Sequence, residues 1–136
     1  MKTKALIPIL TLGVLCLCLP PASRAQDIDN FAPVVVKTVP EAGSKDVPAG
    51  EFEVKITFSK EMADKSWSLC NAWENSIPEA AGEIHYEADH KTCVWKLKLE
   101  AGKTYGCWIN TGKFHGFQDL QHHPAIPYLF TFKVKD

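Results

Sequence analysis

At 136 residues the chain is long enough for one domain with one core, and its 15 basic and 16 acidic residues give a formal net charge of −1. Arg24 is its only arginine, and residues 26–136 carry 12 lysines against 16 acidic residues, a net charge of −4. Residues 26–136 lack guanidinium groups that could pair with phosphates or guanine edges, and their net charge is negative. We therefore expect no nucleic-acid partner.

Residues 1–25 have the features of a cleaved secretory signal. Two lysines precede an apolar run over 5–19, and the small residues Ser23 and Ala25 fit a peptidase site before Gln26. The run is shorter than the roughly twenty residues that a transmembrane helix needs. The alternative is an uncleaved N-terminal anchor. We expect a secreted or periplasmic protein, without membrane contact after cleavage, that has a polar lead-in over 26–31 and one domain over 32–136.

The rest of the chain predicts short strands and no helical periodicity. The clearest strand is 52–58, where Phe52, Val54, Ile56 and Phe58 alternate with polar residues. Seven strands are expected, at residues 33–40, 52–58, 67–69, 83–86, 93–99, 105–109 and 128–134. Together with the turns between them, they predict an all-β, seven-stranded immunoglobulin-like sandwich with Greek-key connections.

Residues around a glycine turn predict how the two sheets are held together. Leu99 ends one strand, Gly102 lies in the turn, and Tyr105 follows in the next strand. In immunoglobulin-like sandwiches this spacing is the tyrosine corner, in which the hydroxyl of the buried ring bonds a backbone group a few residues upstream. We expect these three residues to be structural, together with Phe58 and with Trp67, which stands where such sandwiches bury a tryptophan.

Three cysteines remain after residue 25: Cys70, Cys93 and Cys107. Along the strand axis, the expected positions of Cys93 and Cys107 differ by about four residues, or roughly 13 Å at the rise of a strand. A disulfide tolerates Cα separations of only about 7 Å. We therefore predict no bond between Cys93 and Cys107.

Four segments carry a family resemblance. Residues 33–43, 54–62, 99–105 and 130–132 resemble, in the same order, the bacterial Ig-like domain of the SbsA type, which is found in surface-layer and other exported proteins. The loop before the last strand departs from the family pattern of Asp, a small residue, Gly and Asn: here Asp119 is followed by Leu120-Gln121-His122-His123. The resemblance implies a non-catalytic module for protein or cell-surface interaction.

A second resemblance is to periplasmic copper carriers of the CopC type, also small exported sandwiches. Residues 40–43 and Phe58-Ser59 are similar to their early strands. Those carriers use a histidine at the mature N-terminus as a copper ligand, whereas Gln26 occupies that position here and His85 is the first histidine. A small periplasmic ligand or metal carrier is therefore the alternative function.

Histidines are the candidate metal ligands, since neutral imidazole binds zinc and copper readily. His115, His122 and His123 fall within nine residues of one loop. Adjacent His122 and His123 cannot easily face one ion on an extended backbone, and the chain has no helical H-E-x-x-H motif. We expect solvated loop histidines and no metal or other cofactor, with a metal site as the alternative.

Motifs for catalysis are missing from the sequence. It contains no G-x-S-x-G nucleophile elbow, and its cysteines after residue 25 fall in predicted strands without an activating partner nearby. Nothing in the sequence places two carboxylates across a cleft. We therefore expect no enzyme activity.

Exposed aromatic rings could instead form a platform for sugars. By alternation, Trp67 and Trp95 share a side with core leucines, so they are expected inside. Trp108 has the opposite parity to Tyr105 and is expected to project outward or lie under a loop. Core or loop packing is the preferred interpretation of these tryptophans.

The longest connection, residues 111–127, is expected to be functional, because antiparallel strands need only short loops and longer ones commonly carry function. We expect Phe114, Phe117 and Leu120, at every third position, to anchor it. Alternatively, the loop merely caps the open end of the core. The expected partner is a protein or cell-surface polymer, bound by a monomer. The candidate binding residues are Trp108, His115, Gln118, Asp119, His122 and His123.

Overall fold

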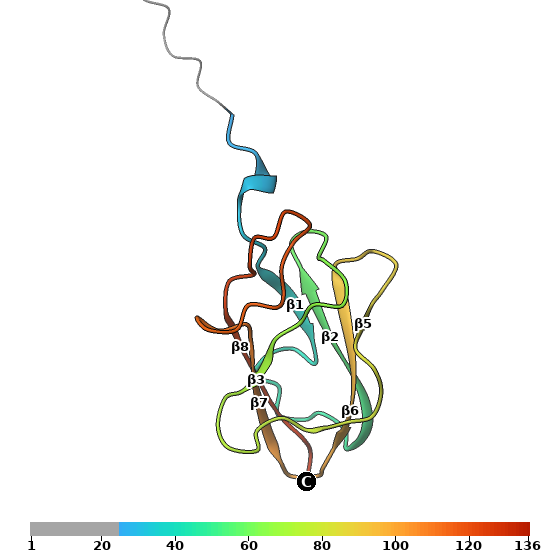
Figure 1. Ribbon diagram of the computed structural model, residues 1–136. Helices are drawn as coiled ribbons and strands as arrows, with labels where there is room; N and C mark the ends of the chain where they lie inside the picture. The colour runs from blue at the N-terminus through green and yellow to red at the C-terminus, as the bar shows by residue number, and fades with distance from the viewer. Residues whose placement is uncertain (1–24) are drawn as a thin grey trace, which may run out of the picture.

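Residues 25–136 are described by a computed structural model in which two β-sheets pack face to face (Figure 1). Apart from Ala25, the expected signal sequence lies outside the described residues. One turn of 3-10 helix, η1 (Ile28–Asn30), precedes the strands. These are β1 (Val35–Val39), β2 (Gly50–Phe58), β3 (Leu69–Asn71), β4 (Glu79–Ala80), β5 (His85–Tyr86), β6 (Thr92–Leu99), β7 (Thr104–Ile109) and β8 (Tyr128–Lys133).

One sheet contains five of the strands and the other contains three. One has the order β1-β2-β6-β4, with β5 also pairing with β6, and the other has the order β3-β7-β8. The chain changes sheet between β2 and β3, between β3 and β4, and between β6 and β7. This arrangement is that of an immunoglobulin-like sandwich with Greek-key connections, which confirms the predicted fold class. In the described part of the chain, no helix has the length and apolar character needed to cross a membrane.

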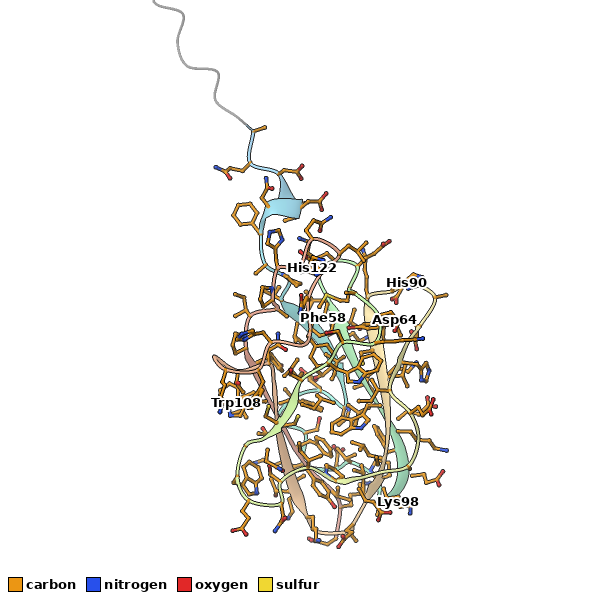
Figure 2. The ribbon with its side chains drawn as sticks, in the orientation of Figure 1. Phe58, Asp64, His90, Lys98, Trp108 and His122 are labelled. Atoms are coloured by element: carbon orange, nitrogen blue, oxygen red, sulfur yellow. The ribbon has the colours of Figure 1, made fainter. Side chains whose placement is uncertain are left out.

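The core forms where alternating strands face each other. Val54, Ile56 and Phe58 of β2 are buried, while the intervening residues face away from the core. β2 pairs with β6 over eight residues, from Gly50 opposite Leu99 to Thr57 opposite Thr92. Phe58 lies inside the sandwich in Figure 2. The alternation that predicted β2 therefore also positions the core.

Two details of the strand prediction need correction. The structure has an additional strand, β4, whose two residues are both exposed and therefore carry no alternation in the sequence. Trp67 does not begin a strand, because β3 starts at Leu69, and its side chain is only half-buried. Its ring packs against Tyr86, with centroids 6.3 Å apart.

The tyrosine corner is present. The Tyr105 hydroxyl accepts a hydrogen bond from the backbone N–H of Glu100 at 3.0 Å, and the Tyr105 ring is buried against Phe132. Gly102 has a φ of +75°, a left-handed conformation that favours glycine in this tight turn. Leu99 is buried beside the turn, as expected.

All three cysteines of the described chain are unpaired. Cys93 and Cys107 are buried in β6 and β7, which belong to different sheets, and Cys70 of β3 is half-buried. Cys93 and Cys107 are therefore not bonded to each other in this structure.

The segment after β1 runs beside the C-terminal end of the chain. Val47 pairs in parallel with Val134, and four backbone hydrogen bonds of 2.7–3.2 Å join residues 43–47 to residues 131–135. The described N-terminal residues and the C-terminus lie at opposite ends of the sandwich (Figure 1).

Candidate functional site

The loop over residues 111–127 lies at the end of the sandwich opposite the C-terminus, beside η1 and the β2–β3 connection (Figure 1). The backbone N–H of Ala63 donates to the carbonyl oxygen of Gln118 at 2.8 Å, and the N–H of Ile126 donates to Pro33 at 3.0 Å. The long loop is therefore bonded to two other segments of the chain.

Asn110, which directly follows β7, holds both arms of the loop. Its side chain is buried, and its amide nitrogen donates to the carbonyl oxygens of Phe117 at 2.8 Å and Ala125 at 3.0 Å. Its amide oxygen accepts from the N–H of Phe117 at 3.0 Å. Asn110 was not predicted as a site residue. The one local signal is an asparagine at the end of a strand, where it adopts a φ of +58° that asparagine tolerates better than most residues.

Only one of the three expected apolar anchors is buried. Phe117 is fully buried and packs against Phe58 with ring centroids 5.2 Å apart. Phe114 and Leu120 are 53% and 56% exposed. The prediction that all three anchor the loop is wrong, because spacing of every third residue defines a common face only in regular structure and this loop is irregular.

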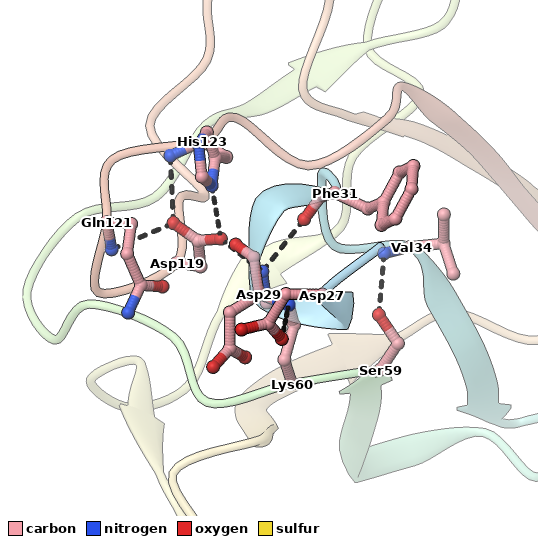
Figure 3. Close-up of polar contacts among 9 residues, drawn as sticks. All are labelled: Asp27, Asp29, Phe31, Val34, Ser59, Lys60, Asp119, Gln121 and His123. Atoms are coloured by element: carbon pink, nitrogen blue, oxygen red, sulfur yellow. Dashed lines mark hydrogen bonds and ion pairs between the residues drawn. The ribbon is translucent and has the colours of Figure 1, made fainter. Parts of the chain in front are cut away.

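Asp119 is the polar centre of the loop (Figure 3). Its carboxylate is fully buried, and one oxygen accepts backbone N–H donors from Gln121 at 2.9 Å and His123 at 2.8 Å. The other oxygen contacts the Lys60 ammonium at 2.7 Å and Nδ1 of His123 at 2.9 Å. Asp119 was expected among the side chains that the loop presents; instead it organises the loop from inside.

The charge of Asp119 is set by these partners. Burial alone would raise the pKa of the carboxyl, but the hydrogen bonds from Lys60 and from the His123 backbone and side chain outweigh it and hold the pKa at about 2. Asp119 is therefore ionised at neutral pH and pairs with Lys60 as a buried salt bridge.

Lys60 joins three segments of the chain. Besides Asp119, its ammonium donates to the carbonyl oxygens of Asp29 at 3.1 Å and Phe31 at 2.8 Å. Figure 3 shows the lysine between the lead-in and the loop. The lead-in is therefore fastened to the domain at this end.

The remaining predicted site residues do not converge. His115 and His122 are exposed, His123 is half-buried against Asp119, and Trp108 is half-buried in β7 opposite Cys70. His122 has a φ of +67°, a left-handed conformation that histidine adopts more often than most residues. Within residues 25–136, no group of three or more histidine, cysteine, aspartate or glutamate side chains is arranged to hold a metal ion.

A cleft of about 370 Å³ separates the lead-in from the loop. Ile28, 74% exposed, stands on one side and Leu120 on the other. Charged groups of both signs line it as well: Asp29, Lys60, Glu61 and Lys91. We call this cleft and its apolar borders the end surface. It can bind an apolar side chain or ring flanked by polar groups.

Comparison with known proteins places the chain in a family. The family model described as the bacterial Ig-like domain matches residues 29–134. No curated protein shows significant sequence similarity to the chain. Domains of this family are generally non-catalytic and typically extracellular or surface-exposed. The chain therefore belongs to the bacterial Ig-like domain family.

Proposed function

We propose that the protein is an exported, non-catalytic Ig-like module of the SbsA type that binds a protein or cell-surface polymer through the end surface. The observation that carries this proposal is the long loop itself. Buried Asn110, Phe117 and Asp119 fix its backbone, while Leu120 is left exposed across the cleft from Ile28. A rigid loop with exposed apolar groups binds a partner at a low cost in conformational entropy.

The state of the thiols supports a non-catalytic role. Burial raises the pKa of Cys93 and of Cys107 to about 12, so both thiols stay protonated at neutral pH. Because the thiolate is the nucleophile, neither cysteine is activated for covalent catalysis.

Binding to isolated cell envelopes of the source organism tests the proposal, measured by co-sedimentation of the purified protein. We expect the variant Ile28→Glu/Leu120→Glu to lose most of its binding. The matched control is Val36→Glu in β1, a 58% exposed residue that does not line the end surface. Equal binding by all three proteins would remove the end surface from the function.

A further inference from the structure

A second cleft, of about 660 Å³, opens beside the segment that precedes β3 and the segment from β4 to β5. Its wall residues Trp67, Tyr86, Trp95 and Ile84 are apolar or aromatic, and its rim residues are Asp64, Lys65, Glu83 and His85. None of these residues lines the end surface. We propose that this side cleft binds the pyranose rings of a glycan.

The walls supply flat aromatic surfaces. The Trp67 and Tyr86 rings lie 6.3 Å apart and are tilted by 43°, and both side chains are half-buried. Trp95, which points inward from β6, also lines the cleft. A pyranose ring has an apolar C–H face that packs on such rings. The alternation of the sequence predicted that Trp67 faces the core. Because Trp67 precedes β3, the alternation of inward and outward side chains along a strand does not apply to it.

The rim favours sugar hydroxyls over other ligands. A hydroxyl both donates and accepts hydrogen bonds. The carboxylates of Asp64 and Glu83 accept, the Lys65 ammonium donates, and the His85 imidazole can do either. An organic cation would pair with the two carboxylates but leave the Lys65 ammonium without a partner, and a purely apolar ligand would leave all of these polar groups without partners. The hydroxyls of a neutral glycan can donate hydrogen bonds to the carboxylates and accept one from the ammonium.

One group of the wall lacks a partner. The Tyr86 hydroxyl is buried and makes no hydrogen bond within the described residues. An unpaired buried hydroxyl is unfavourable, so packing rather than a hydrogen bond holds the Tyr86 ring in the wall.

Titration followed by ¹H–¹⁵N NMR tests the side cleft in the unmodified protein, because its four tryptophans provide separate indole N–H signals. The probes are maltotriose, cellotriose and triacetylchitotriose, each added alone, with tetramethylammonium chloride as the probe for organic cations. For at least one sugar we expect shifts of the Trp67 and Trp95 signals with a Kd of about 1 mM or tighter. The signals of Trp73 and Trp108 should not move; Trp108 lies on the opposite side of the molecule from Asp64 in Figure 2.

Variants identify the contacts. Trp67→Ala should abolish sugar binding, and Glu83→Ala, on the exposed rim, should weaken it about tenfold through a lost charge-assisted hydrogen bond. Trp73→Ala is the matched control, since Trp73 is 45% exposed and packs at Gly106 of β7, away from the cleft lining. If Trp67→Ala does not fold, the Glu83→Ala titration and the indole shifts decide.

The proposal is wrong if no sugar shifts the Trp67 signal, if only Trp73 or Trp108 responds, or if tetramethylammonium binds and the sugars do not. These outcomes leave the envelope-binding test of the end surface unaffected. Conversely, sugar binding that persists in the Ile28→Glu/Leu120→Glu variant would support the side cleft independently.

Discussion

Two buried tyrosine hydroxyls in this domain have opposite hydrogen-bonding states. The Tyr105 hydroxyl accepts from the N–H of Glu100, whereas the Tyr86 hydroxyl has no partner within the described residues. A net hydrogen bond contributes about 1 kcal/mol to stability, while removing an unpaired buried hydroxyl is neutral or favourable. The same substitution should therefore have different effects at the two sites.

We expect Tyr105→Phe to lower the free energy of unfolding by about 1 kcal/mol and Tyr86→Phe to leave it unchanged or raise it. Urea denaturation of both variants and the parent measures the difference. Because each variant loses one hydroxyl from a tyrosine in the same fold, each serves as the control for the other. Equal losses at the two positions would contradict the assignment of the corner bond.

The buried carboxylate of Asp119 predicts a loss of stability in acid. Its pKa is lowered from 3.8 to about 2 in the folded protein, so its contribution is fully present above pH 4 and is lost as the pH falls toward 2. The shift corresponds to about 2 kcal/mol.

Denaturation midpoints at pH 5 and pH 2.5 test this prediction in the parent and in Asp119→Asn. The variant should be less stable at pH 5, because it leaves Lys60 without its carboxylate, and should lose less stability between the two pH values. Asp89 and Glu51 also have lowered pKa values, but they are unchanged in both proteins and cancel in the comparison. Parallel pH profiles would rule out Asp119 as the titrating group.

At the scale of elements, the long loop depends on a close backbone approach. A Cβ atom at Gly116 would lie 2.5 Å from the carbonyl carbon and oxygen of Trp67, whereas one at Gly112 would meet nothing within 4 Å. The N–H of Gly116 also donates to the Ser68 hydroxyl at 2.7 Å. The loop therefore rests directly on the backbone that precedes β3.

We expect Gly116→Ala to destabilise the domain by about 1–3 kcal/mol through overpacking. Gly112→Ala should be neutral or stabilise it by up to about 1 kcal/mol, because alanine restricts the unfolded chain more than glycine does. Thermal unfolding of the two variants measures both effects. A Gly116→Ala protein as stable as the parent would mean that the loop is not held against Trp67.

Elements with one buried face could be predicted from the sequence, and the others could not. Alternation identified β2 and β8, in which buried and less buried residues alternate, and also β6 and β7, in which some of the intervening residues are buried as well. β4 has two exposed residues and gives no such signal. The spacing of Leu99, Gly102 and Tyr105 located the corner, because these residues are close together in the sequence.

The site was less predictable because its contacts are not local. Asn110 bonds residues seven and fifteen positions away, and Lys60 reaches Asp119 across 59 positions. The same polar residue types occur on exposed surfaces elsewhere in the chain. No pattern in the sequence marked Asp119 as buried, or marked Phe117 rather than Phe114 as the anchor.

At the scale of the whole molecule, we predict that the three cysteines after residue 25 remain free even in an oxidising compartment, which permits disulfides. Cys93 and Cys107 are buried in different sheets, and Cys70 is the single half-buried thiol of the three. Thiol titration in denaturant without reductant should give three groups per chain for material that begins at Gln26. One free group per chain would contradict this prediction and would show that two of the three thiols, such as those of the neighbouring strands β3 and β7, have paired.

The four backbone hydrogen bonds between residues 43–47 and residues 131–135 also determine how the domain responds to tension. These segments run in parallel, and the described N-terminal residues lie at the opposite end from the C-terminus. A pull on the two ends therefore shears the four bonds together rather than opening them one at a time. The rate of forced unfolding, rather than the equilibrium stability, determines how well the domain resists such a pull. We therefore expect the domain to unfold slowly when it is stretched by its two ends.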